Sequence, residues 1–148
     1  MSLVQQPEPF DDWDWIYEIK HVGFRALAVI EQGQCRFLSR KKHKLTCHQD
    51  LRAALVKEVN AETALLDGEL VVIDHLGRSV FADLMQRRHL ARYFAFDLIS
   101  LNGEDLTKLT LLARRKTETD LTIAISPCSL CRPFAWQWDC ALSQNTDN

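Results

Sequence analysis

Three residues in the first quarter of the chain have the types and spacing for nucleophilic chemistry: Lys20, Gly23 and Arg25, within the segment Glu18–Ala28. A lysine amine attacks an electrophile only when it is unprotonated, and with an unperturbed pKa of ~10.4 only about 0.1% of it is neutral near physiological pH. Such a lysine therefore needs cationic neighbours or a metal ion, and Arg25 is a candidate neighbour. Considered alone, Lys20 is better explained as a solvated lysine at the end of a strand.

Two later segments carry residues that suit nucleotide chemistry. Leu65–Val72 places Glu69 after a tight Asp-Gly step, and Tyr93–Ile99 contains Phe96, a flat apolar ring suited to stacking on a base. In this order the three segments resemble three motif blocks of ATP-dependent DNA ligases, and the linking text extends the resemblance from about Phe10 to Arg115. The chain is most similar to the ligase domain of bacterial end-joining and repair ligases.

The resemblance implies an adenylation (nucleotidyltransferase) domain. Ligases of this family move AMP from ATP to a lysine, release pyrophosphate, and pass the AMP to a 5′-phosphate at a DNA nick, which is then sealed. Lys20 matches the catalytic lysine, and the positions that match nucleotide contacts are Arg25, Arg40, Glu69 and Phe96. Glu69 also matches a carboxylate that contacts the ribose or a metal. The implied cofactors are ATP and Mg²⁺, and the implied partner is nicked double-stranded DNA.

Each of these residues also has a plainer interpretation. In isolation Phe96 is a core residue, Glu69 is a surface acid and Arg40 is a solvated cation. The basic run that contains Arg40 is either a solvated loop or a contact for DNA phosphates, and its candidate DNA-binding residues are Arg40, Lys41, Lys42 and Lys44. The three ordered blocks favour the site interpretation for all of them.

The chain departs from the ligase pattern in two places. Val22 stands where the family motif K-x-D-G-x-R has aspartate, and a β-branched residue is also unfavourable in the tight turn that we expect there. The later family elements, a glutamate in E-G-x-x-x-K and a further pair of lysines, are not found after Arg115. We therefore expect a truncated and degenerate DNA ligase domain. The alternative is a catalytically inert remnant that at most binds nucleotide or DNA.

The hydrophobic periodicity predicts the elements that position these residues. Strands are expected at Trp15–Lys20 and Phe24–Ile30, paired through a turn at residues 21–23, and at Gln34–Arg40, Leu65–Ile73 and Arg92–Leu101. Helices are expected at His48–Val59 and around Phe81–Arg88. The fold class is α+β with an antiparallel sheet, and the resemblance makes it an incomplete, ATP-grasp-like ligase adenylation domain.

Composition divides the chain near Lys116. Residues 1–116 carry 17 Lys and Arg against 16 Asp and Glu, whereas residues 117–148 carry one Arg against four acids. We expect an N-terminal tail at 1–9, the partial adenylation domain at 10–116 and a divergent tail at 117–148, for which a shifted reading frame is one hypothesis. Cys128 and Cys131 form a C-x-x-C in this tail, so a small zinc-dependent interaction module is a further alternative.

The remaining composition bounds the setting of the protein. Five cysteines, an odd number without a secretory signal, indicate reduced thiols and a cytoplasmic location. The sequence contains no apolar run long enough for a membrane helix. The net charge of -2 is not that of a basic nucleic-acid-binding protein, so any DNA affinity must come from local basic patches.

Overall fold

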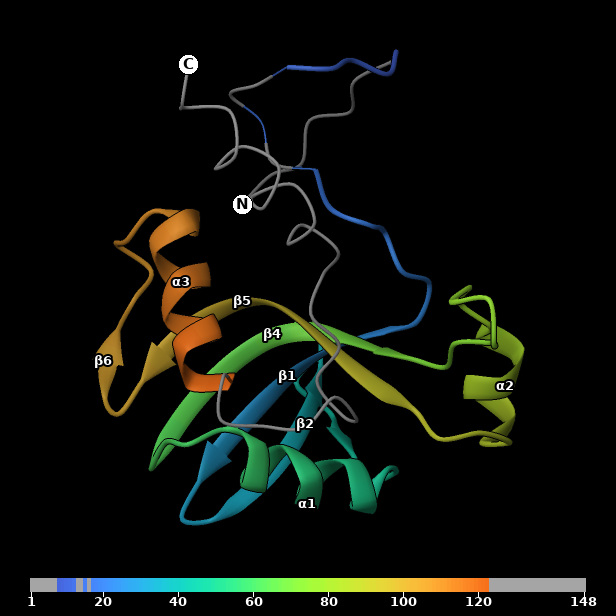
Figure 1. The fold of residues 1–148 in the computed structure, drawn as a ribbon. Helices are drawn as coiled ribbons and strands as arrows, with labels where there is room; N and C mark the ends of the chain where they lie inside the picture. Colours follow the sequence, from blue (N-terminus) through green and yellow to red (C-terminus); the bar gives the residue numbers. More distant parts are fainter. Residues whose placement is uncertain (1–7, 13–14, 16, 123–148) are drawn as a thin grey trace. The chain divides into compact units, whose positions relative to one another are not determined.

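The computed structural model describes residues 8–12, 15 and 17–122. The chain divides into two compact units, one made of Lys20–Pro133 and the other of Met1–Ile19 with Phe134–Asn148. The larger unit contains every described helix and strand (Figure 1). Of the predicted tail at 117–148, the structure describes only residues 117–122. The C-x-x-C lies outside the described residues, and so does the part of the tail from residue 123 onward to which the shifted-frame hypothesis applies.

An antiparallel sheet forms the centre of the larger unit. Its six strands lie in the order β3-β2-β1-β4-β5-β6, and every neighbouring pair is antiparallel. The bounds are β1 Phe24–Glu31, β2 Gln34–Ser39, β3 Lys44–Leu45, β4 Thr63–Val71, β5 Arg92–Leu101 and β6 Glu104–Asp105. The helices are α1 Gln49–Glu58, α2 Phe81–Gln86 and α3 Leu111–Thr122. Figure 1 shows α2 and α3 at opposite ends of the sheet.

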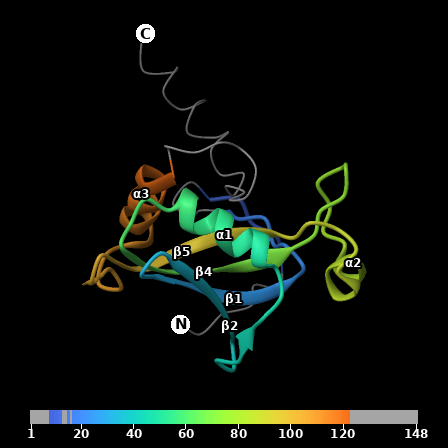
Figure 2. The ribbon, with the colours of Figure 1, turned by 90° about the horizontal axis from the view of Figure 1, so that it is seen from below.

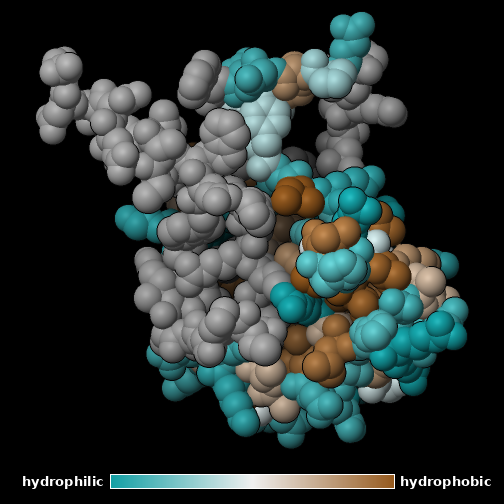
Figure 3. Space-filling view, turned by 45° about the vertical axis from the view of Figure 1, so that its right-hand side comes forward, coloured by the Kyte–Doolittle hydropathy of each residue, from teal (hydrophilic) through white to brown (hydrophobic). Residues whose placement is uncertain are grey.

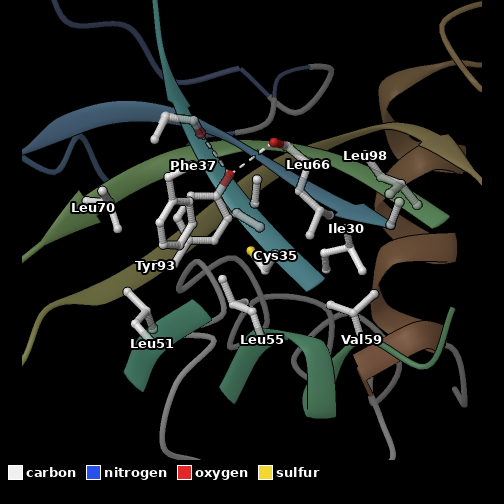
Figure 4. Close-up of a cluster of buried hydrophobic side chains, with 14 of the residues drawn as sticks. Ile30, Cys35, Phe37, Leu51, Leu55, Val59, Leu66, Leu70, Tyr93 and Leu98 are labelled. Atoms are coloured by element: carbon white, nitrogen blue, oxygen red, sulfur yellow. Dashed lines mark hydrogen bonds between the residues drawn. The ribbon is translucent and has the colours of Figure 1, made fainter. Parts of the chain in front are cut away.

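The hydrophobic core lies between one face of the sheet and α1. Alternate strand residues point into it, and α1 runs across the strands beneath them (Figure 2). Leu51 and Leu55 on α1 meet this face, as the spacing of apolar residues in the sequence predicts (Figure 4). Tyr93 is fully buried among them, and its hydroxyl lies 2.9 Å from the Ala26 carbonyl oxygen and 3.0 Å from that of Leu66.

Most of the expected elements are confirmed. The strands at Gln34–Ser39, Thr63–Val71 and Arg92–Leu101 and the helices α1 and α2 lie where periodicity places them, within two residues at each end. The α+β antiparallel class is therefore correct. The two-residue strands β3 and β6 and the helix α3 were not predicted.

The expected strand at Trp15–Lys20 is wrong. The described residues of this range form no strand, and the ring of Trp15 instead meets Phe10 edge to face at 5.1 Å while the Tyr17 hydroxyl donates to the Phe10 carbonyl. The physical reason is that β1 already pairs with β2 on one side and β4 on the other. Both edges of β1 are occupied, so the alternating segment before it has no ladder to join.

None of the helices that the structure describes is long and apolar enough to cross a membrane.

Candidate functional site

The face of the sheet that is turned away from α1 carries several of the predicted site residues, and we call it the outer face. Ala26 and Ala28 point into the core, so Arg25, one residue earlier on β1, lies on the opposite side. Arg25 pairs in register with Glu69 on β4. Because residues directly opposite each other point to the same side of a sheet, the structure brings these two charged side chains together.

A β-bulge brings Phe96 to this face. On β5, Asp97 pairs with Asp67 and Ala95 pairs with Gly68, so Phe96 is an extra residue without a partner on β4. In a regular strand, side chains alternate between the two faces of the sheet. An extra residue at a bulge interrupts this alternation and redirects a side chain. Phe96 is only partly buried, which corrects its plainer interpretation as a core residue.

Arg25 lies over Phe96. Its guanidinium carbon is 5.3 Å from the centre of the ring, and its nitrogens donate to the Asp67 carboxylate at 3.1 and 2.6 Å. The hydrogen bonds to Asp67 raise the pKa of Arg25, with burial opposing. The Arg25 side chain is 57% exposed, so water screens the pair and its contribution to stability is at most about 1 kcal/mol. The pair fixes a planar cation above an aromatic ring.

The loop Lys20–Gly23, which we call the acceptor loop, is held by two hydrogen bonds from its main-chain N–H groups to the side chains of other segments. The N–H of Gly23 donates to Glu69 Oε1 at 2.7 Å, and the N–H of Val22 donates to Ser79 Oγ at 3.2 Å. A Cβ at Gly23 would lie 2.0 Å from the Leu70 carbonyl oxygen. Glycine is thus required here for a close approach of two main chains. The expected tight turn at residues 21–23 is wrong, since no turn is formed and Gly23 has no positive φ.

His21, within this loop, is held by an aromatic ring. Its imidazole stacks on Phe94 with 3.9 Å between centroids, and its Nδ1 lies 3.4 Å from Ser79 Oγ. Burial lowers the pKa of His21, and the Glu69 carboxylate opposes that shift. The neutral imidazole is therefore the favoured form at neutral pH. Lys20, the residue before it, is exposed to solvent.

A second ion pair lies on the other side of the bulge. Arg114 of α3 donates to both oxygens of Asp97, at 2.6 and 2.9 Å, and to the Leu109 carbonyl oxygen. Asp97 and Asp67 are neighbours across β5 and β4, where two carboxylates repel. Each is neutralised by its own arginine, which keeps the strand pair stable at this point.

The basic run lies at the edge of the sheet, in the turn from β2 to β3. The turn is closed by main-chain hydrogen bonds between Ser39 and both Lys42 and His43, and Lys42 has a φ of 62°. Ser39, the last residue of β2, pairs with Ala26 on β1. Because the two strands are antiparallel, Arg40, which follows Ser39, lies next to Arg25, which precedes Ala26. All four predicted DNA-binding side chains are exposed, and they are Arg40, Lys41, Lys42 and Lys44.

The outer face suits a nucleotide better than a bound metal alone. Within the described residues no group of three His, Cys, Asp or Glu side chains could hold a metal ion. Glu69 is hydrogen-bonded to Gly23, and Asp67 is paired with Arg25, so neither carboxylate is free of a protein partner. A magnesium ion would therefore need the phosphates of a nucleotide as further ligands. The Phe96 ring and Arg25 offer a flat surface and a positive charge for such a ligand.

Comparison with known proteins decides the family. The sequence profile described as the ATP-dependent DNA ligase domain matches residues 6–126. The chain belongs to this family. ATP-dependent DNA ligases are nucleotidyltransferases, and the resemblance deduced from the three motif blocks is confirmed.

The relatives include non-homologous end joining proteins and DNA ligases. The multifunctional non-homologous end joining protein LigD of Pseudomonas aeruginosa is 36% identical over 119 residues, which cover 77% of this chain and 14% of that protein. The LigD DNA repair protein of Mycobacterium tuberculosis is 32% identical, covering 76% of this chain and 15% of that protein. The DNA ligase of Pyrobaculum calidifontis is also 32% identical, covering 68% and 20%.

Solved structures show the same fold. The ligase domain of M. tuberculosis LigD superposes with a TM-score of 0.66 at 30% identity and covers 77% of this chain and 38% of that one. A mycobacterial DNA ligase D complexed with ATP and MES gives a TM-score of 0.62 at 31% identity, with the same coverage. The chain thus spans about a seventh of the length of the LigD proteins and under two fifths of their ligase-domain structures.

Sequence reasoning missed several residues that contact the predicted site residues or the acceptor loop. Asp67 and Phe94 stood inside the motif blocks, but nothing in the pattern showed that Asp67 holds Arg25 or that Phe94 supports His21. Ser79 gave no signal at all, since it lies 57 residues from Val22 and outside every motif block. The pairing of β4 with β5 and the bridge between Ile73 and Ser79 bring these groups together.

Proposed function

We propose that this chain is the nucleotide-binding part of a DNA ligase adenylation domain and that it binds ATP on the outer face of its sheet without forming a stable lysyl-AMP. The observation that supports binding is Arg25, held by Asp67 directly over Phe96 at the bulge of β5. The adenine ring stacks on Phe96, and Arg25 turns from Asp67 toward the nucleotide. The finer assignment of an incomplete, ATP-grasp-like nucleotidyltransferase fold is part of this proposal.

Each predicted site residue has a role in the proposal. Lys20 is the position that accepts AMP in the ligase family, and it stands three residues before the Gly23 that docks on β4. Glu69 orients the acceptor loop through the Gly23 N–H, and it contacts the ribose or Mg²⁺ when nucleotide is bound. Arg40 leaves β2 beside Arg25 and contacts the phosphates.

Val22 is the reason that transfer fails. The residue is 54% exposed and presents an isopropyl group where the ligase motif has a carboxylate. Phe24, two residues later, meets Phe81 of α2 edge to face at 5.3 Å, and Met85 on α2 is exposed. Figure 3 shows apolar side chains gathered on the side that Figure 1 has at its right, where α2 lies. One missing charged contact at a reacting phosphate removes about 3 kcal/mol of transition-state stabilisation, more than a hundredfold in rate.

Nicked duplex DNA is the proposed partner, and its contact surface is the turn from β2 to β3. The Lys41 and Lys42 side chains at this turn are exposed, and exposed cations bind phosphates without regard to base sequence. The relatives named above are DNA ligases and end-joining proteins, which supports the same partner.

Two measurements test the function together. Calorimetric titration with ATP and Mg²⁺ measures binding, and labelled ATP followed by denaturing electrophoresis measures covalent transfer. We expect saturable binding and no labelled band. Arg25→Ala should raise the Kd at least about tenfold, the value of one charge-assisted hydrogen bond. Arg36→Ala is the matched control, because Arg36 is also a strand arginine paired with a carboxylate, that of Glu31. A labelled band that disappears in Lys20→Ala identifies an active adenylating domain instead.

A further inference from the structure

Ser79 makes two contacts with the acceptor loop, although no motif block contains it. Its Oγ accepts the N–H of Val22 at 3.2 Å and lies 3.4 Å from Nδ1 of His21. Both of these residues lie between Lys20 and Gly23, where the chain has no helix or strand. The loop thus has one side-chain anchor at Gly23, through Glu69, and a second at its centre, through Ser79.

The chemistry of a hydroxyl fits both contacts at once. An oxygen that accepts the Val22 N–H keeps its own proton available, and a neutral imidazole with its hydrogen on Nε2 offers Nδ1 as the acceptor. Stacking on Phe94 fixes the plane of the His21 ring, so Nδ1 stays aimed at Ser79. Alanine at this position keeps neither contact, whereas threonine keeps the hydroxyl.

The anchor itself is rigid. Ser79 forms a bridge with Ile73, and the N–H of the next residue, Val80, donates to the Val72 carbonyl at 2.8 Å. The tip of this connection is closed by Asp74, whose Oδ1 accepts the main-chain N–H groups of Leu76 and Arg78. Ser79 is therefore held by the main chain at the end of β4, independently of its hydroxyl.

We propose that Ser79 is a positioning residue that sets the orientation of Lys20 toward the nucleotide through the Val22 N–H and His21. The inference rests on the proposed function, because it concerns the same nucleotide site. Ser79 touches neither ATP nor the amine. Its hydroxyl limits the rotation of the acceptor loop and so restricts the positions that the solvent-exposed Lys20 side chain can take.

The test uses the whole chain and two independent readouts. Amide hydrogen exchange at Val22, without ATP, reports the anchor. Acetylation of Lys20 by N-hydroxysuccinimidyl acetate, with and without ATP and Mg²⁺, reports how well nucleotide covers the amine, with Lys108 as the internal reference. The variants are Ser79→Ala, Ser79→Thr as the conservative rescue, and Thr107→Ala, which removes a hydroxyl that donates to Asp105 far from the loop.

We expect Ser79→Ala to speed Val22 exchange and to reduce the protection of Lys20 by ATP, each about fivefold, the factor that one hydrogen bond of about 1 kcal/mol gives. Exchange at Leu70 in the core should stay unchanged, Ser79→Thr should restore both values, and Thr107→Ala should match the wild type. Equal protection of Lys20 in wild type and Ser79→Ala overturns this inference alone, as does a Thr variant that behaves like Ala. ATP that protects Lys20 in no variant overturns the proposed function as well.

Discussion

Glu69 accepts the main-chain N–H of Gly23 at 2.7 Å, across the gap between the acceptor loop and β4. The carboxylate that the ligase resemblance assigns to ribose or metal thus also holds the loop that carries Lys20. A carboxylate with a main-chain donor is fixed in direction, since a charge-assisted hydrogen bond is about twice as strong as a neutral one. Glu69 therefore has two roles, one toward the acceptor loop and one toward the ligand.

Substitution of Glu69 separates its two roles. Glu69→Gln keeps an oxygen that accepts the Gly23 N–H but removes the charge, whereas Glu69→Ala removes both. We expect the glutamine variant to bind ATP alone with the affinity of the wild type and to lose the additional affinity that Mg²⁺ provides. The alanine variant should lose affinity in both conditions. Titrations with and without Mg²⁺ measure this, and a glutamine variant with unaltered magnesium dependence would rule out Glu69 as a metal contact.

A methyl group at Gly23 should displace the acceptor loop. The added Cβ would lie 2.0 Å from the Leu70 carbonyl oxygen, so the loop must move away and its hydrogen bond to Glu69 breaks. We expect Gly23→Ala to lose at least about tenfold in ATP affinity, since the lost contact involves a charged group. The midpoint of urea unfolding should change little, because Gly23 lies outside the strands. Gly33→Ala, with nothing within 4 Å but a φ of +69°, is a control that strains a turn far from the loop.

The sequence predicted the sheet and helices of this chain better than it predicted the site. Strands such as Arg92–Leu101 are recognisable because their apolar residues form a long run bounded by a turn at Asn102 and Gly103. The prediction of a strand at Trp15–Lys20 was wrong for a non-local reason. Alternation of apolar and polar residues shows that a segment could form a strand, but not whether another strand has an unpaired edge to which it could hydrogen-bond. The pairing of β1 with β4, 39 positions later along the chain, closed that edge.

The same limit applies to the site. Lys20, Arg25, Glu69 and Phe96 could be named as candidates because local motifs carry them, and the structure brings Arg25, Glu69 and Phe96 to one face. The contacts that fix them, from Asp67 to Arg25 and from Ser79 to Val22, join residues 42 and 57 positions apart. Their geometry depends on the bulge at Phe96 and on the bridge at Ser79, and neither leaves a periodic signal in the sequence.

Stability should fall as the pH drops below about 6.5. Burial lowers the pKa of His21, and burial together with the charges of Arg87 and Arg52 lowers that of His48. The unfolded chain then binds more protons than the folded chain below the ordinary value of 6.5, so protons favour unfolding until the folded-state pKa values are passed. Urea unfolding at pH ~7.5 and ~5 measures the loss. The double variant His21→Gln, His48→Gln should flatten this dependence, and an equal slope in the variant would contradict the assignment.

DNA binding should depend on the turn between β2 and β3. Lys41→Ala with Lys42→Ala removes two cations from that turn, so affinity for a nicked duplex should fall, and the slope of log K against log salt should become less steep by about 1.8, or about 0.9 for each phosphate contact. Lys57→Ala with Lys108→Ala is the matched control, because both lysines are exposed and lie elsewhere, Lys57 on α1 and Lys108 in the turn between β6 and α3. Equal salt slopes for the two double variants would show that this turn does not contact DNA.

The most direct test of the account is to map where ATP binds. Amide chemical shifts of the labelled chain are followed as ATP and Mg²⁺ are added. We expect saturable changes on the outer face, at Lys20–Arg25, Asp67–Glu69 and Phe94–Asp97. The alternative location is the groove of about 410 Å³ between the β1–β2 turn and α1, which Gln34 and Arg52 line. Changes confined to that groove, or no saturable change at all, would contradict the claim that this chain binds ATP on the outer face of its sheet.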